Sequence, residues 1–441
     1  MAATSGLRTG MPRLALATIL GALLCASPAR AGTQDIFGFG ARGAALGGAS
    51  VAFARGWEAV YYNPAGILLG GERSFSVGMM AAVYDLSIES PRPAGVEGIA
   101  DEDALSGLTV GIAVRLPLRG WLADRIAIGL GLYIPTRELL AAEIPRPYTP
   151  QLSLVAGRAR TVAIQAGLAF KPAAWLTLGG GLRALAALQG HIDVGPNELG
   201  RLGSNVEDEL VAHYAAVVGL LATPHPAWSV GLVWRSQLDA SFALPITADF
   251  GDKLPLKVPR LEIAGTANFD PGQVALHVGY KPLASLSIEA GVTWKDWSEF
   301  PLPIVNTTTA VPAQPPLDFR DTFVPRIGVE GTLPLADRWD LTMRAGYAFE
   351  PSPVPDQTGL HNFLDAHRHV AGAGVGASFT TAGGFRTAVD LYGQVHAFHA
   401  RTFEKDPAPA GVATVTDNAG WPWIGLSGAF YGFGAVVEID L

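Results

Sequence analysis

The sequence predicts an all-β protein: a 14-stranded antiparallel transmembrane β-barrel with an N-terminal hatch segment inside its lumen. Three observations support this fold: an apolar composition without a membrane-helix run, long strands of alternating polarity, and connections that alternate between short and long. Of the 441 residues, 49% are hydrophobic and 16% are charged, and the mean hydropathy is +0.27. After residue 31, no run approaches the ~18–20 apolar residues of a membrane helix. Two classes remain, a large soluble β protein and an outer-membrane barrel.

Residues 1–31 have the features of a secretory signal peptide. Two arginines precede an apolar run from Leu14 to Cys25, and residues 29–31 form an A-x-A cleavage site. Cys25 leaves a lipoprotein as an alternative, although Leu24 fits that pattern poorly. Removal of the signal leaves no cysteine, which excludes disulfides and cysteine-ligated metal. It also leaves 28 basic against 39 acidic residues, a net charge of −11 that argues against nucleic-acid binding.

Strict alternation of apolar and polar residues distinguishes the two remaining classes. In "DLTMRAGYAFE" (340–350), five apolar side chains fall on one face, and Asp340, Thr342, Arg344 and Glu350 fall on the other. The same pattern recurs at 74–83, 229–237, 285–295, 385–396 and 431–441. These strands run about 10–14 residues, longer than the usual ~5–6. Charges in mid-strand, such as Arg183 and Asp390, favour a membrane barrel with a polar lumen over a soluble sandwich.

The connections also alternate in length, as they do in bacterial barrels. The short turns are 117–125, 171–175, 223–228, 281–285, 334–339 and 380–384. The long links are 89–103, 141–157, 193–207, 247–270, 306–323, 351–367 and 405–421. Thirteen connections require fourteen strands, with short turns in the periplasm and long loops outside. Trp121, Trp175, Trp228 and Trp339 lie at short turns, where an interfacial aromatic girdle is expected.

Residues 32–72, which precede the first strand, are predicted to close the barrel. Fourteen strands enclose a lumen too wide for the wall's own side chains to fill. The segment is rich in glycine and alanine, contains Asn63-Pro64-Ala65, and holds five aromatic residues that argue against a disordered tail. The predicted organisation is therefore a signal peptide (1–31), a hatch (32–72) and a barrel (73–441).

At this point the chain resembles a known family. "RGAALGGASVAFARGWEAVYYNPAGI" (42–67) is similar to the N-terminal hatch of FadL-type outer-membrane transporters, in which Asn-Pro-Ala is a hallmark. Residues 323–357 and 365–379 resemble the late-barrel signature of the same family. The resemblance implies passive uptake of long-chain fatty acids, or alternatively of aromatic hydrocarbons, across the outer membrane. It also implies a capture groove among the outer loops, movement of the hatch and lateral exit through the wall. The chain departs from outer-membrane barrels in ending with Leu441 in place of an aromatic residue.

A lateral gap has candidate residues in the third predicted strand. Pro135 cannot donate a ladder hydrogen bond, so a kink at Ile134, Pro135 and Thr136 would interrupt pairing with a neighbour. Gly129 and Gly131 leave the same wall thin. The alternative is that Pro135 lies at the outer end of the strand, where it is harmless.

A fatty-acid carboxylate favours a cation beside its pocket. Arg320 follows an outer loop, and Arg344 and Arg183 point inward by parity, so these three arginines are the candidate ligand residues. Salt bridges within the lumen are the alternative for each. The apolar loop stretches 152–157 and 361–367 are candidate capture surfaces, unless they pack on each other.

Other functions have weaker support. No Gly-x-Ser-x-Gly nucleophile elbow occurs, so no enzyme is predicted. His367 and His369 share a face without an evident third ligand, and neither a metal nor a cofactor is predicted. A general porin or a structural barrel whose outer loops do the work remains open. The expected partners are hydrophobic small molecules, outer-membrane lipid and lipopolysaccharide, and the expected state is a monomer.

Overall fold

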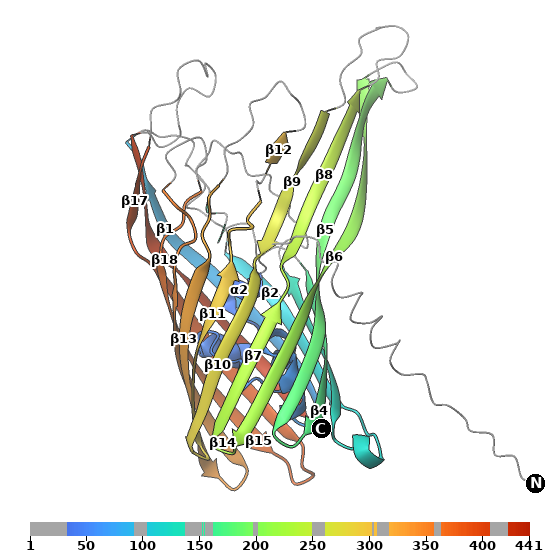
Figure 1. Cartoon of the computed structure of the whole chain (residues 1–441), viewed down its shortest axis with the longest axis vertical. Coiled ribbons are helices and arrows are strands. Elements are labelled where there is room, and N and C mark those ends of the chain that lie inside the picture. The colour runs from blue at the N-terminus through green and yellow to red at the C-terminus, as the bar shows by residue number, and fades with distance from the viewer. Residues whose placement is uncertain are drawn as a thin grey trace, which may run out of the picture.

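The computed structural model is a closed β-barrel that surrounds a short helical segment (Figure 1). It describes residues 33–91, 104–136, 152, 154, 162–196, 202–248, 261–301, 304–306, 317–356, 363–405 and 422–441. The fourteen barrel strands are β1 (Arg73–Glu89), β2 (Leu105–Arg115), β3 (Ile126–Pro135), β4 (Ala163–Ala173), β5 (Leu176–Pro196), β6 (Leu202–His225), β7 (Trp228–Arg235), β10 (Gly272–Leu283), β11 (Leu286–Asp296), β13 (Thr322–Ala336), β14 (Trp339–Glu350), β15 (Arg368–Thr380), β16 (Arg386–Phe398) and β18 (Trp423–Asp440).

Each of these strands pairs antiparallel with its neighbours in chain order, and β1 closes the ring against β18. That closing ladder runs from Ser74 opposite Asp440 to Glu89 opposite Gly425. All six short turns occur where the sequence predicts them, at the lower end in Figure 1, where the C-terminus also lies. The predicted fourteen-stranded fold is confirmed.

Four further strands lie outside this ring: β8 (Leu238–Ala248), β9 (Leu261–Asp270), β12 (Ile304–Asn306) and β17 (Arg401–Glu404). They extend the sheet on the side of the long connections (Figure 1). The sequence places loops at 193–207 and 247–270, but β5 and β6 continue as a hairpin to Pro196 and from Leu202. Pairing between β5 and β6 satisfies the backbone groups of these extensions, and β5 also pairs with β8. In the second predicted loop, β9 occupies Leu261–Asp270.

The two faces of the wall follow the predicted alternation. Large apolar side chains such as Phe75, Met79, Leu391 and Phe433 point outward and are exposed, as a lipid-facing surface requires. The four tryptophans predicted at the short turns are all exposed, including Trp121 in the turn helix η3 (Gly120–Leu122). They form the expected interfacial girdle.

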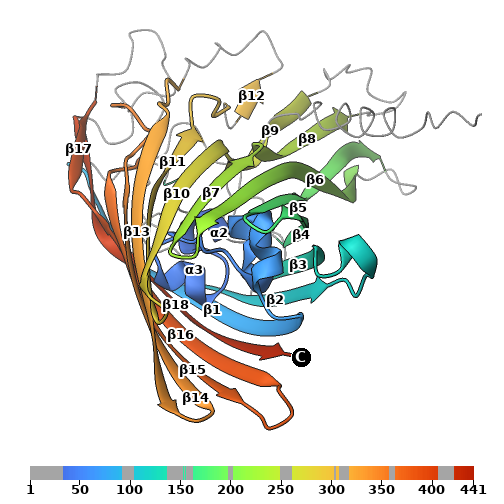
Figure 2. The same cartoon turned by 60° about the horizontal axis from the view of Figure 1, so that its bottom comes forward.

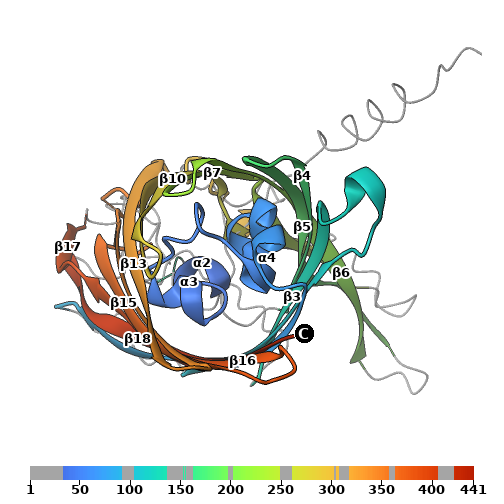
Figure 3. The same ribbon diagram turned by 90° about the horizontal axis from the view of Figure 1, so that it is seen from below.

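The hatch lies inside the ring, as the tilted view in Figure 2 and the view along the barrel in Figure 3 show. Its helices are α2 (Thr33–Phe37), α3 (Ala41–Ala45), η1 (Gly56–Glu58), α4 (Ala59–Tyr62) and η2 (Pro64–Leu69). None of the described helices is long and apolar enough to cross a bilayer. The predicted signal peptide lies outside the described residues.

Candidate functional site

The Asn63-Pro64-Ala65 motif fixes the hatch to one side of the wall. Asn63 is fully buried; its side-chain oxygen accepts the Ala65 N–H at 3.1 Å and so caps η2. Its side-chain amide donates to the carbonyl of Val51, at 3.0 Å, and to that of Leu220 in β6, at 3.1 Å. One side chain therefore joins two hatch segments to the barrel.

The wall opposite this motif is thinned by glycine. A Cβ at Gly219 would lie 3.0 Å from Pro64 Cδ, and a Cβ at Gly179 would lie 2.7 Å from Ala65 Cα. Only glycine allows the two backbones to come this close. Gly129 and Gly131 are predicted to leave the wall thin, but the hatch side chains Val60 and Phe39 occupy the space beside them.

A carboxylate on β11 holds the loop between α3 and η1. Glu289 accepts three successive backbone N–H groups, from Val51 at 2.5 Å, Ala52 at 2.9 Å and Phe53 at 3.0 Å. His277 on β10 contacts the same carboxylate through Nδ1 at 2.9 Å. Backbone N–H groups that converge on a carboxylate form charge-assisted hydrogen bonds, which are stronger than neutral ones.

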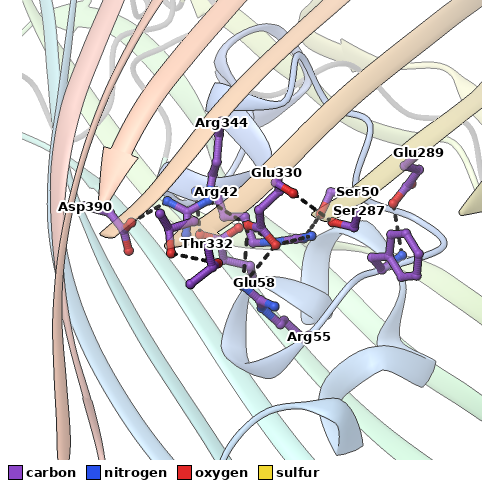
Figure 4. Close-up of polar contacts among 12 residues, drawn as sticks. Arg42, Ser50, Arg55, Glu58, Ser287, Glu289, Glu330, Thr332, Arg344 and Asp390 are labelled. Atoms are coloured by element: carbon purple, nitrogen blue, oxygen red, sulfur yellow. Dashed lines mark hydrogen bonds and ion pairs between the residues drawn. The ribbon is translucent and has the colours of Figure 1, made fainter. Parts of the chain in front are cut away.

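A second carboxylate, Glu330 on β13, is the buried centre of an ion cluster (Figure 4). We call this the Glu330 cluster: Glu330, Arg42, Arg55, Arg344 and Asp390. Arg42 from α3 approaches Glu330 at 2.9 Å, Arg344 from β14 at 2.7 Å, and Arg55 at 3.2 Å. Arg344 also pairs with Asp390 on β16. Two of the three cations belong to the hatch, so the ion pairs of this cluster join the hatch to the wall.

Glu58 of the hatch lies beside the Glu330 cluster and binds the start of α3. Its two carboxylate oxygens accept the N–H groups of Arg42, at 3.1 Å, and Gly43, at 3.0 Å. Burial raises the pKa of Glu58 to about 7, although Arg42 opposes the shift. Towards the short-turn end, a polar cavity of about 290 Å³ adjoins Glu58, Arg55 and Arg344.

A third network ties the first hatch helix to the wall. Lys295 on β11 lies 2.8 Å from Asp35 in α2 and 3.2 Å from Glu350 on β14. Burial by itself would raise the pKa of Asp35, but the Lys295 ammonium, the Gln273 hydrogen bond and the Arg235 charge together lower that pKa. Arg326 pairs with Glu350 at 2.6 Å and donates to the carbonyl of Gly47 at 2.7 Å. The adjoining cavity measures about 50 Å³, room for a few waters and not for a large solute.

Outward of the hatch, towards the long connections, the lumen is apolar. Ile36 and Phe37 of α2 form the base of a buried cluster that continues to the outer ends of the strands. We call this cluster the outer chamber. Five of its aromatic side chains are in mutual contact, with ring centroids 4.5–6.4 Å apart: Phe269, Trp297, Phe300, Phe319 and Phe363. These packed rings form an apolar lining outward of the hatch.

The comparisons with known proteins agree with this geometry. The family model for outer membrane protein transport proteins (OMPP1/FadL/TodX) matches residues 22–391. The chain belongs to the FadL/TodX family. It is therefore an outer-membrane transport protein of a family that transports hydrophobic compounds.

Solved structures show the same fold at low sequence identity. A FadL homologue from Pseudomonas aeruginosa superposes with a TM-score of 0.62 at 15% identity, over 94% of this chain and 100% of that one. The toluene transporter TodX from P. putida gives 0.53 at 14% identity, over 92% and 99% of the two chains. No curated protein sequence matches the chain.

Within this FadL/TodX-family barrel, two of the three candidate ligand arginines are in ion pairs. Arg183 on β5 pairs with Asp270 and lies 5.6 Å from the Tyr61 ring centroid, while Arg344 belongs to the Glu330 cluster. Arg320 is exposed, and its backbone N–H donates to the Pro353 carbonyl at 2.9 Å. The structure does not bring these three side chains together.

The candidate lateral opening lies at the outer end of β3. Pairing with β2 continues through Ile134 and Pro135, and the Thr136 N–H donates to the Ser106 carbonyl at 3.0 Å. On the other side, described pairing with β4 ends at Tyr133 opposite Ala163. An opening at this position therefore concerns the β3–β4 side of the strand.

The predicted capture surfaces are partly inside the chamber. Leu152, Leu154, Phe363 and Leu364 are buried in the apolar cluster, and the rest of 152–157 together with 361–362 lies outside the described residues. The contacts of Glu289 and Glu330 with the hatch are not predicted from the sequence, although both residues fall on the polar face of their strands by parity. Their hatch partners are more than 230 residues distant, so parity alone could not identify them.

Proposed function

We propose that this FadL/TodX-family protein takes up long-chain fatty acids by passive diffusion. A solute enters the outer chamber by its apolar part, the hatch shifts relative to the wall, and the solute leaves sideways near the outer end of β3. The observation that carries this proposal is the division of the lumen into an apolar chamber and a polar, ion-paired hatch interface beneath it.

This division favours an apolar solute over ions or sugars. Transfer of an alkyl chain into the chamber gains about 0.8 kcal/mol for each buried CH₂ group, whereas a hydrated ion would lose its water there. The chamber is closed at its base by Ile36 and Phe37, so a solute can pass further towards the short turns only if the hatch moves. A general porin needs a continuous aqueous path, which the packed hatch opposes.

Arg320 supplies the preference for an acid. The neighbouring Phe319 is buried in the chamber, whereas Arg320 is exposed at its margin. A fatty acid could therefore place its tail beside Phe319 while its carboxylate remains near the guanidinium in water. Such a charge-assisted contact orients the solute without requiring a buried charge.

Aromatic hydrocarbons are the second candidate substrate. The rings of Phe269 and Trp297 are stacked at 5.5 Å and 24°, and Phe300 contacts Phe319 at 4.5 Å. A flat ring can insert into such a cluster and keep the offset or edge contacts that aromatic groups prefer. One of the two structural neighbours is a toluene transporter.

In this proposal the protein acts as a monomer in contact with lipid and lipopolysaccharide. Each barrel strand has a partner on both sides, so closure of the sheet requires no second chain. The exposed apolar face of the wall matches a bilayer.

Competition binding tests the substrate class. The purified protein in detergent is titrated with a fluorescent long-chain fatty acid, and then with toluene or an alkylbenzene as competitor. Arg320→Ala should weaken fatty-acid binding several-fold and leave alkylbenzene binding unchanged, whereas Arg338→Ala, an exposed arginine in the β13–β14 turn, is the matched control. Stronger displacement by alkylbenzene than by unlabelled fatty acid would move the assignment to hydrocarbons. Absence of saturable binding for both would refute the proposal.

The lateral route needs a separate measurement of uptake. Pro135→Ala adds a backbone donor at the end of β3 and should slow uptake into proteoliposomes while binding in detergent stays the same. Equal uptake by the variant and the wild type would argue against exit at this position.

A further inference from the structure

A pair of histidines occupies the outside of the barrel near the long connections. His369 on β15 lies between Arg368 and Val370, which are both buried in the lumen, so by strand parity its side chain points outward. His399 follows β16 directly and is exposed. Tyr347 and Phe349 project from the outer face of β14 beside them. This position is separate from the lumen, the hatch and the outer chamber.

The two imidazoles face one another through the same ring atom. His369 Nε2 lies 2.5 Å from His399 Nε2, and the ring centroids are 4.6 Å apart. In the metal-free pair one Nε2 can donate its hydrogen to the other, and a metal cation can take the place of that hydrogen between the two nitrogens.

The surroundings are compatible with the tautomer that a metal ligand needs. His369 Nδ1 lies 2.5 Å from the Tyr347 hydroxyl, which can accept its hydrogen and leave the Nε2 lone pair directed at His399. Metal-binding histidines commonly donate their second ring nitrogen to such a partner, which also orients the ring. Phe349 packs against both imidazoles, at 5.3 Å and 6.1 Å between ring centroids.

From this geometry we propose that His369 and His399 form a binding site for a divalent transition-metal ion such as Zn²⁺, Cu²⁺ or Ni²⁺. Imidazole nitrogen is a preferred ligand of these ions. Bonds of about 2.0–2.1 Å at a tetrahedral angle place two ligand nitrogens about 3.3 Å apart. The two rings need to separate by less than about 1 Å, which their exposed side chains can do by small rotations.

The site provides two protein ligands, and water completes the coordination. Among the residues that the structure describes, no group of three or more His, Cys, Asp or Glu side chains is placed to hold a metal. His367 is near His399, at 6.1 Å between ring centroids, but its Nδ1 accepts the Ser352 N–H at 2.9 Å. Its Nε2 therefore bears the hydrogen in the neutral ring and does not serve as a third ligand.

A bound ion would stabilise the outer rim beside the outer chamber. The His399 N–H already donates to the His367 carbonyl at 2.7 Å, and the buried residues Phe363, Leu364 and Ala366 immediately precede His367. A metal across His369 and His399 would add a side-chain cross-link beside the β15–β16 ladder, which already pairs Arg368 with Phe398.

Metal titration of the untagged, full mature chain in detergent tests this proposal. Cu²⁺ is followed by electron paramagnetic resonance, which reports the number of nitrogen ligands, and Zn²⁺ by calorimetry. We expect one ion per chain with two nitrogen ligands. His369→Ala and His399→Ala should each weaken binding at least tenfold, and Tyr347→Phe, which removes only the orienting hydroxyl, about tenfold. His225→Ala, in the exposed β6–β7 turn at the opposite end, is the matched control and should bind like the wild type.

Retained heat-modifiable migration on gels shows that each variant still forms a barrel. Mild acid should release the ion, because protons compete for the same lone pairs. Unchanged binding by both His369→Ala and His399→Ala, or loss of binding in His225→Ala alone, would overturn the proposal. Coordination by a single nitrogen in the wild type would also overturn it.

Discussion

Glu330→Gln is the sharpest test of the hatch as a movable closure. The substitution keeps the size of the side chain and one oxygen acceptor but removes the negative charge that faces Arg42, Arg55 and Arg344. Arg344 retains Asp390, and Arg42 retains the Ser50 hydroxyl at 2.8 Å, but Arg42 loses the carboxylate to which it is paired. Removal of one partner of a buried ion pair costs about 3–5 kcal/mol.

That cost applies to the docked hatch, because Glu330 is on the wall and two of its cations are on the hatch. In an undocked hatch, Arg42 and Arg55 would be hydrated and would not need the carboxylate. The population of undocked hatch should therefore rise about a hundredfold to a few thousandfold, since about 1.4 kcal/mol corresponds to tenfold. The strands should be unaffected, because their ladders do not depend on Glu330.

Hydrogen–deuterium exchange with mass spectrometry measures this population directly. Peptides from 41–53 should exchange at least a hundredfold faster in Glu330→Gln, whereas peptides from β14 and β15 should not change. Glu404→Gln, an exposed carboxylate on β17, is the matched control. Exchange of the hatch peptides at the wild-type rate would show that the Glu330 cluster does not hold the hatch, and the reasoning would fail.

Single-channel conductance provides an independent readout of the same equilibrium. Brief openings should become more frequent in Glu330→Gln, because a displaced hatch leaves a wide lumen. A hatch that exchanges faster without any increase in conductance would indicate local fraying of α3 and not displacement of the whole segment.

Three further predictions concern the hatch. The pKa of Glu58 is raised to about 7 in the docked hatch from an ordinary 4.5, so the docked hatch binds more protons than the undocked hatch between these two pH values. Docking should therefore weaken by about 3 kcal/mol as the pH rises from 4.5 to 7. In Glu58→Gln, the hydrogen–deuterium exchange of the hatch should lose this pH dependence. Asn63→Ala removes a helix cap and the amide that donates to the Val51 and Leu220 carbonyls, so hatch docking should weaken by about 2–4 kcal/mol. Faster protease cleavage within the hatch at unchanged barrel stability checks this prediction, and resistance equal to that of the wild type would contradict it. Gly346→Val places a side chain where a Cβ would already lie 2.5 Å from the Gly47 nitrogen; the barrel should still form, as gel migration shows, while the hatch becomes protease-sensitive, and an intact, protected hatch would refute the close approach.

The sequence by itself determined the wall of this protein. Side-chain direction in a strand depends only on residue parity, so the alternation in 340–350 identified the lumen face and the lipid face without any tertiary information. Turn length and the exposed tryptophans then fixed the strand number and the end at which the short turns lie. The same local logic correctly placed Arg183 and Arg344 inside the lumen.

The tertiary structure decided which inward residues meet. The pairings of Arg183 with Asp270, Glu289 with Val51 and Glu330 with Arg42 each join segments at least 87 residues apart. Such contacts depend on the stagger between strands and on where the hatch rests, and neither leaves a periodic signal in the chain.

The outer surface shows the same limit. Parity puts His367 and His369 on one face, but the partner of His369 is His399, which follows the end of the neighbouring strand β16. The spacing of two residues is a property of one strand, whereas a metal site or a closure forms between strands. Local alternation therefore fixed the architecture of the barrel, and three-dimensional register fixed the chemistry inside and around it.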